Sequence, residues 1–245
     1  MPDTDKKPIE IVYDEAPLRM GYVQGDTKEL VVCFSSVGNA RAIMPPFEFV
    51  GTATATGRHG LFISDIGRSW MNGAQQAEIV TKQVKKIVAA QGITSVTTMG
   101  LSMGGFNALI APRLFHVDRV IAFSPQYSVH PKHIPDEPRW VFWRRKINPW
   151  RFETVEPLPE GPQLFVFHGL QDDAAHAHAF PTQDNLDHFF FPAFDHTGLT
   201  TRLKEKGLLS RMVEHALAGR RVGVARVTKR MGGNFRSRFN EDPAL

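Results

Sequence analysis

The sequence predicts an α/β protein with a mainly parallel sheet flanked by helices, and three observations support this. Short, nearly continuous apolar runs recur along the chain, and such runs are typical of strands that are covered on both faces. Segments with the apolar spacing of a helix lie between these runs. Strands that alternate with helices form βαβ units, which build parallel sheets. A chain of 245 residues is long enough to bury one large core.

Six apolar runs are the predicted strands, and most end in small or polar residues. They are Leu30–Phe34, Leu61–Ile63, Ser95–Met99, Val120–Phe123, Gln163–Phe167 and His188–Phe191. Three helices are predicted over residues 77–88, 103–111 and 199–217, and Gly207 favours a break in the last of them. We expect residues 1–218 to form a single domain.

One connection, from about residue 127 to residue 160, has no strand pattern. It contains six prolines and three of the four tryptophans, Trp140, Trp143 and Trp150. Long irregular connections in compact domains often act as lids or binding loops, but tryptophan also covers cores well. Two interpretations therefore stay open. The segment is either a lid or cap, with Trp140, Trp143 and also Trp70 binding the substrate, or a packed surface excursion.

The composition excludes several classes of protein. The apolar fraction of 42% and the charged fraction of 22% are unlike those of a disordered, collagen-like or coiled-coil chain. The single cysteine, Cys33, excludes an intrachain disulfide and a cysteine-based zinc site. The N-terminus lacks the apolar core of a signal peptide, and no apolar run reaches about 18 residues. We therefore expect a cytoplasmic protein without a membrane span.

The net charge of +4 arises near the C-terminus. Between Arg202 and Arg238, eleven Lys and Arg residues and two acidic residues give a local net charge of +9. We expect residues 219–245 to form a basic appendage, which is either a solvated tail or a contact for an anionic surface. No nucleic-acid motif and no phosphate-binding glycine motif is present, so we expect no cofactor.

The residues Gly100-Leu-Ser102-Met-Gly104 match the pattern G-x-S-x-G, which on its own is common by chance. Here the pattern follows a predicted strand and precedes a predicted helix, and this context is the one that an exposed nucleophilic serine needs. The two glycines leave room for a sharp turn. The helix N-terminus and the N–H of Met103 lie beside the serine, where they can stabilise an oxyanion. The alternative is a glycine-rich turn without chemistry.

A serine hydroxyl needs a base, and the base needs an orienting acceptor. Asp172 follows the predicted strand at 163–167, and the neighbouring Asp173 is its rival. His196 lies in a loop between the strand at 188–191 and a predicted helix. The competing histidines are His168, His176, His178 and His188. Some of them crowd with the two aspartates between residues 168 and 178, but they match no metal-binding motif, so we expect no metal.

Together, the segment Gly100–Gly105, the turn Gly169–Asp172 and His196 resemble the α/β-hydrolase superfamily, from about Val31 to Leu217. The resemblance implies the α/β-hydrolase fold, with Ser102 as nucleophile, Asp172 as acid and His196 as base. It is specific for the superfamily and says little about the substrate.

The resemblance also implies two oxyanion donors. One is the N–H of Met103, and the other is the N–H of Ser36 or Val37, in a loop where Ser35 replaces the family's usual histidine. Three further segments resemble small bacterial hydrolases that are linked to surface polysaccharides and glycans: Phe62–Asp65, Ser69–Asn72 and Ser124–Pro125.

The expected function is hydrolysis of a carboxylic ester or thioester through an acyl-enzyme. The substrate would be an acyl ester of a small molecule or a glycan. Two alternatives remain at this stage. One is an acyltransferase that uses the same residues on a glycan or another hydroxyl acceptor, and the other is a non-catalytic binding protein on the same fold. The sequence does not specify an oligomeric state.

Overall fold

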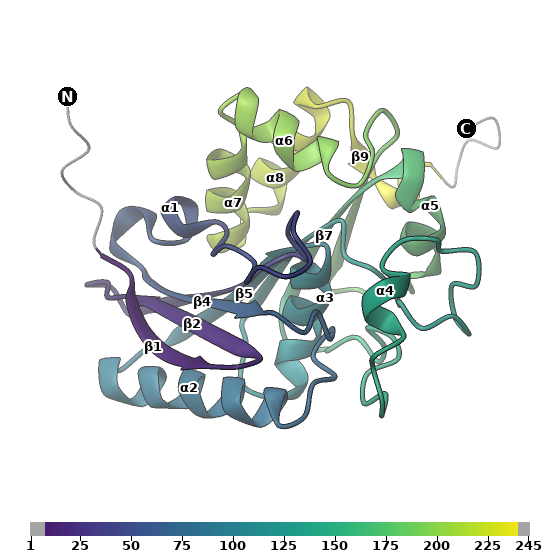
Figure 1. The fold of residues 1–245 in the computed structure, drawn as a ribbon. Coiled ribbons are helices and arrows are strands. Elements are labelled where there is room, and N and C mark those ends of the chain that lie inside the picture. The colour runs from purple at the N-terminus through teal and green to yellow at the C-terminus, as the bar shows by residue number, and fades with distance from the viewer. Residues whose placement is uncertain (1–7, 240–245) are drawn as a thin grey trace.

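The computed structural model describes residues 8–239, which form a nine-stranded sheet with helices on both faces (Figure 1). The strand order is β1-β2-β4-β3-β5-β6-β7-β8-β9. Neighbouring strands from β4 to β8 run parallel, whereas β1, β2 and β9 are antiparallel to their neighbours. The strands are β1 (Glu10–Glu15), β2 (Leu18–Val23), β3 (Glu29–Phe34), β4 (His59–Asp65), β5 (Ser95–Leu101), β6 (Arg119–Phe123), β7 (Gln163–Gly169), β8 (Leu186–Phe191) and β9 (Asn234–Phe235).

Helices cover the two faces of this sheet in two groups. The α-helices are α1 (Val50–Ala53), α2 (Gln76–Gln91), α3 (Met103–Ile110), α4 (Val141–Arg144), α5 (Leu170–Ala179), α6 (Gly198–Glu205), α7 (Leu209–Leu217) and α8 (Arg221–Arg230). Helices α2 and α3 pack on one face, and α6, α7 and α8 pack on the other. Within residues 8–239, none of these helices has the length and apolar character needed to cross a membrane.

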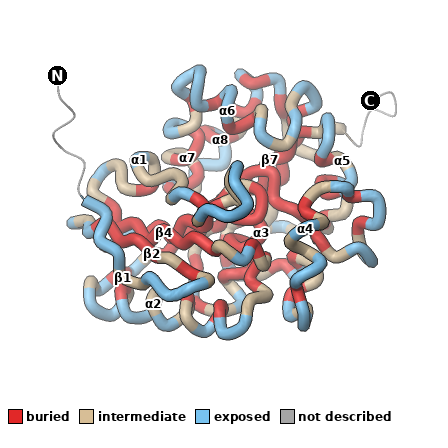
Figure 2. Tube along the Cα trace, viewed as in Figure 1, coloured by how far each residue is buried: buried red, intermediate tan, exposed pale blue. Residues whose placement is uncertain are grey.

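Burial on both faces explains the predicted strands. In β3, Leu30 and Val32 join the core under α2, while Val31 and Cys33 join the core under α7. Figure 2 shows the central strands as a buried layer between the two groups of helices, whereas the edge strand β1 is largely exposed. All six predicted strands and the mainly parallel sheet are confirmed. The break at Gly207 is also confirmed, since α6 ends before it and α7 begins after it.

The predicted basic appendage differs from the structure. Residues 221–230 form α8, and β9 pairs with β8 through Phe235 and Asn234. Val224 and Val227, three residues apart on α8, are buried in the core under α7, so the basic side chains share their helix with a core-facing stripe. Helix α8 and strand β9 thus pack against the sheet, whereas the expected domain ended at residue 218. Residues 240–245 lie outside the described part of the chain, and contact with an anionic surface stays a prediction.

The segment from residue 127 to residue 160 connects β6 to β7, and its only α-helix is α4. Its apolar side chains Trp140, Phe152 and Val155 join the core beside α3. A hydrogen bond of 3.0 Å from the Val155 N–H to the Tyr127 carbonyl holds the two ends of the segment together. The segment is therefore packed on the domain, and its role as a lid stays a prediction.

Candidate active site

Ser102 lies at a sharp turn between β5 and α3. Its backbone has φ 58° and ψ −124°, a strained conformation for a residue with a side chain. A Cβ at Gly100 would lie 2.2 Å from the carbonyl carbon of Gly104, and a Cβ at Gly104 would lie 2.1 Å from the carbonyl oxygen of Phe34. Both positions therefore require glycine, and the predicted strand-to-helix turn is confirmed.

His196 stands between Ser102 and an aspartate. Its Nε2 lies 2.8 Å from the Ser102 Oγ, and its Nδ1 lies 2.7 Å from the Asp173 Oδ2. An ionised carboxylate only accepts hydrogen bonds, so Nδ1 carries the ring proton and donates it to Asp173. This tautomer leaves Nε2 free to accept the Ser102 hydroxyl proton. The structure thus brings a hydroxyl, a base and an orienting carboxylate into one series.

The carboxylate on Nδ1 of His196 is Asp173, whereas the expected acid was Asp172, and the catalytic role of either stays a prediction. Asp172 Oδ1 accepts the backbone N–H of His196 at 2.6 Å, and its side chain is 43% exposed. Asp173 is 1% exposed. Residues 170–179 form helix α5 rather than a turn. Successive helical residues point about 100° apart, so only one of the two aspartates faces the sheet edge.

A cation from the connecting segment binds the same aspartate. The guanidinium of Arg139 lies 2.9 Å from Asp173 Oδ1, and it also makes two bonds to Glu137, at 2.8 and 2.7 Å. Burial would raise the pKa of Asp173, but the hydrogen bond from His196 and nearby positive charges, including Arg139, lower it overall. The pKa of Glu137 is also lowered, because hydrogen bonds from Arg139 and His176 outweigh its burial.

The predicted oxyanion donors lie beside the serine turn. Met103 is the first residue of α3, so its N–H has no acceptor within the helix. The N–H of Ser36 already donates to Glu48 Oε2 at 3.2 Å. Within residues 8–239, no acceptor is found for the N–H of Val37. Of the two alternatives, Val37 therefore has the N–H that is available to a ligand.

Gln126 is a polar contact of Ser102 that the sequence did not predict. Its Nε2 lies 2.8 Å from the Ser102 Oγ, and its Oε1 lies 3.0 Å from the indole Nε1 of Trp70. Gln126 follows the end of β6, the strand next to β5. The signal for this contact is a polar residue just after the end of the strand that neighbours the serine strand.

The structure brings two of the three predicted substrate-binding tryptophans, Trp70 and Trp140, into contact, and the third, Trp143, has other ring partners. The ring of Trp140 lies 5.3 Å from the ring of His196 and 6.2 Å from that of Trp70, measured between centroids. Trp143 instead packs against Phe142 and the guanidinium of Arg68. Trp70 and Trp140 thus lie beside Ser102 and His196, and substrate binding by any of the three stays a prediction.

Two other histidines near this site form a buried pair. His168 Nδ1 lies 2.8 Å from His188 Nε2, and His168 Nε2 lies 2.8 Å from the carbonyl oxygen of Pro125. Burial lowers the pKa of His168 to about 4, and it also lowers the pKa of His188. Both rings are therefore neutral at pH 7. The histidine that contacts Ser102 is His196, and neither member of this pair is hydrogen-bonded to the serine within residues 8–239.

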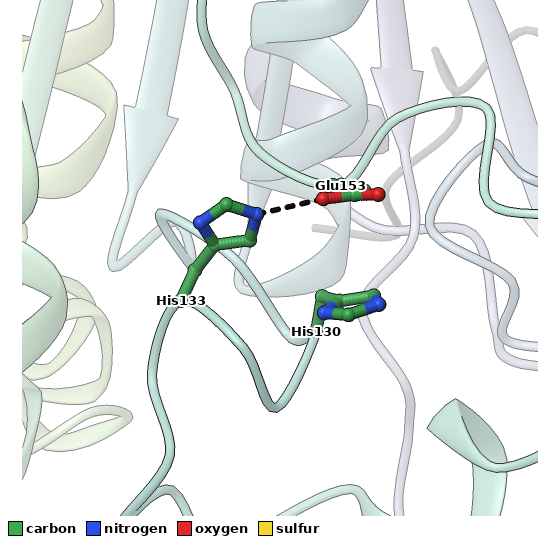
Figure 3. A group of neighbouring side chains, drawn as sticks. All are labelled: His130, His133 and Glu153. Carbon is green, nitrogen blue, oxygen red and sulfur yellow. Dashed lines mark hydrogen bonds and ion pairs between the residues drawn. The ribbon is translucent and has the colours of Figure 1, made fainter.

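One group in the connecting segment has the side chains that a metal site uses. His130, His133 and Glu153 each place one ligand atom within 4.8 Å of the others (Figure 3). His133 Nε2 lies 2.8 Å from Glu153 Oε2, and His130 Nδ1 accepts the N–H of Lys132 at 3.1 Å. These contacts use one ring nitrogen of each histidine and one oxygen of Glu153.

A cleft of about 600 Å³ lies next to the serine turn. It is lined by Leu101, by residues 47–52 including Phe47 and Phe49, and by parts of α6 and α7. Its wall combines these apolar side chains with Glu48 and Lys204. Leu101 precedes Ser102, and Glu48 binds the Ser36 N–H, so the cleft shares residues with the surroundings of the hydroxyl.

No protein-family model matches the chain, and neither does the sequence of any curated protein. Several solved structures do match. The capsule O-acetyltransferase of Neisseria meningitidis serogroup A has a TM-score of 0.56 and 12% identity, over 80% of this chain and 92% of its own. A lidless α/β serine hydrolase from Xanthomonas campestris has a TM-score of 0.56 and 12% identity, over 86% and 95%. A Pyrococcus furiosus esterase has a TM-score of 0.53 and 15% identity, over 82% and 85%.

Proposed function

Because this chain has the α/β-hydrolase fold, we propose that it is a serine hydrolase that cleaves a carboxylic ester or thioester through an acyl-enzyme. One observation carries the proposal: the hydrogen-bonded series from Ser102 through His196 to Asp173, with distances of 2.8 and 2.7 Å. The fold alone does not specify a function, so the argument rests on these side chains.

The proposed reaction begins when His196 Nε2 takes the Ser102 proton and Oγ attacks the substrate carbonyl carbon. Asp173 holds the imidazole in the required tautomer and stabilises the imidazolium. The N–H groups of Met103 and Val37 donate to the oxyanion, and one such donor lowers the barrier by about 3–4 kcal/mol. His196 then gives the proton to the leaving oxygen or sulfur. Water attacks the acyl-enzyme by the same route and releases the acid.

The proposed binding site for the acyl group is the cleft beside Leu101. Its apolar wall includes Phe47, Phe49 and Leu209, which suits a short hydrocarbon chain. The ring of Trp140 lies 5.3 Å from the ring of His196, so an alcohol or sugar leaving group beside His196 would meet this ring first. The proposed substrate is therefore an acyl ester of a small molecule or a glycan. A cytoplasmic location stays a prediction.

The test compares two serine variants on p-nitrophenyl acetate and butyrate. We expect Ser102→Ala to lower kcat/KM by at least about 1,000-fold, because the nucleophile is lost. Ser124→Ala is the matched control, since Ser124 is also buried at this sheet edge but its Oγ has no hydrogen-bond partner within the described residues. Equal activity of Ser102→Ala and the wild type would refute the assignment.

A second candidate function, transfer of the acyl group to a hydroxyl acceptor, has two supporting observations. One structural neighbour is a capsule O-acetyltransferase, and Ser102 is only 3% exposed. Shielding from water favours an acceptor other than water. Mass analysis of the products, with and without added glycan, separates the two functions. A non-catalytic binding protein would show neither product, and Ser102 would not react with a fluorophosphonate probe.

A further inference from the structure

The side-chain amide of Gln126 bridges the indole of Trp70 and the hydroxyl of Ser102. The indole nitrogen lies 3.0 Å from the amide oxygen, and the amide nitrogen lies 2.8 Å from the Ser102 Oγ. All three side chains are buried, so water does not compete for these contacts. The series of hydrogen bonds therefore has a defined direction.

This direction follows from which groups can donate. The indole N–H of Trp70 is a donor only, so the oxygen of the Gln126 amide must face it. The amide NH₂ then faces Ser102, and because it has only donors, Ser102 Oγ must accept from it. On the other side of the serine, His196 Nε2 is an acceptor, since Nδ1 donates to Asp173. The single Ser102 proton consequently points at His196.

We propose that Gln126 and Trp70 are positioning residues that fix the Ser102 hydroxyl proton on the line to His196. The proposal rests on the proposed function, because the direction of this proton matters only if His196 removes it. A rotated amide would turn its oxygen toward Ser102 and accept the same proton, in competition with His196. Trp70 prevents this rotation, since its buried N–H would lose its acceptor.

A purely structural role for Gln126 predicts different behaviour. If the amide only satisfied buried polar atoms, its replacement would lower stability without a specific effect on the chemistry of Ser102. A positioning role predicts a lower kcat at unchanged KM. It also predicts a pH-dependent effect when an acceptor replaces the donor. Three variants separate the two roles.

The first two variants remove one member of the series each. Gln126→Met keeps the approximate shape and removes the donor to Ser102, and Trp70→Phe removes the N–H that orients the amide. Each is expected to lower kcat and the rate of fluorophosphonate labelling of Ser102 about 10-fold, the scale of one buried hydrogen bond. Gln183→Met and Trp150→Phe are matched controls elsewhere in the chain and should label at the wild-type rate.

The third variant, Gln126→Glu, gives the pH signature. An ionised glutamate can only accept, so it draws the Ser102 proton away from His196, whereas a protonated glutamate again has a donor. The labelling rate of this variant, divided by the wild-type rate at the same pH, is expected to rise as the pH falls. A structural defect would not be repaired by acid.

Three outcomes are informative. Slow labelling of all three variants, with the rise toward acid for Gln126→Glu and unchanged controls, supports the proposal. Wild-type labelling rates in folded Gln126→Met and Trp70→Phe, or a Gln126→Glu ratio that is flat with pH, would overturn it while leaving the proposed function intact. If Ser102 of the wild type does not label at all, the proposed function fails and this inference fails with it.

Discussion

Asp172 and Asp173 are adjacent carboxylates with different contacts, and their amide variants separate their roles. Asp173→Asn removes the negative charge beside the Nδ1 of His196, which lies 2.7 Å from the carboxylate oxygen. For two unit charges about 4 Å apart, at an effective dielectric constant of about 20, the interaction is worth about 4 kcal/mol. The loss of the imidazolium's partner alone therefore lowers the rate by about 1,000-fold. An asparagine NH₂ facing Nδ1 would also favour the wrong tautomer, which raises the expected loss toward 10,000-fold.

Asp172→Asn is the matched control for this loss. The amide oxygen can still accept the backbone N–H of His196, and the lost charge is on a side chain that is 43% exposed. Exposed charge pairs are worth about 1 kcal/mol or less, so the expected fall is at most about fivefold. The assay is kcat/KM for p-nitrophenyl acetate, with circular dichroism to verify folding. A loss for Asp172→Asn as large as that for Asp173→Asn would refute the assignment of Asp173.

Three further predictions concern the surrounding structure. Gly104→Ala places a methyl group 2.1 Å from the Phe34 carbonyl oxygen and should lower the free energy of unfolding, measured in urea, by at least about 3 kcal/mol. The control Gly161→Ala, whose methyl group meets nothing within 4 Å, should leave it unchanged. Equal urea midpoints for the two variants would contradict this. Burial raises the pKa of the Cys33 thiol, so a disulfide reagent such as DTNB should react only after unfolding, and rapid reaction of the native protein would be inconsistent with its position. Because the pKa of Glu137 is lowered in the fold, its carboxylate stabilises the fold fully at a pH above the ordinary glutamate pKa of about 4.3, and this contribution is lost as the pH falls below that value. Glu137→Gln should therefore reduce the fall of the urea midpoint between pH 6 and pH 3. An unchanged dependence of the midpoint on pH would argue against the ion pair with Arg139.

The sheet could be predicted because its chemistry is local. Strands buried on both faces need apolar residues at nearly every position, as in residues 164–167, and that pattern is visible without any tertiary information. The serine turn was predictable for a similar reason. Gly100, Ser102 and Gly104 are neighbours in sequence, and the close approach of Gly100 to Gly104 follows from the turn between them, whereas the approach of Gly104 to Phe34 is a tertiary contact.

Other parts of the site depend on where a helix begins, which sets the direction of its side chains, and on residues that are distant in sequence. The choice between Asp172 and Asp173 needed the start of α5, because one helical step decides which carboxylate reaches the imidazole ring of His196 and which reaches its backbone N–H. Arg139 contacts Asp173 from an irregular connection, whose sequence shows no helix or strand periodicity from which the contact could be predicted. The sequence shows the basic character of residues 219–239. The two buried valines Val224 and Val227 are too few, among many charged residues, to predict a core-facing helix there.

The central claim is that Ser102 attacks a carbonyl carbon and carries the acyl group. The most direct measurement is the mass of the intact protein after rapid mixing with an acyl ester and quenching in acid, followed by peptide mapping. One added acyl group per chain is expected, located on the peptide that contains Ser102 and absent from Ser102→Ala. Turnover of the ester without an acyl group on Ser102, or with the acyl group on another residue, would contradict it.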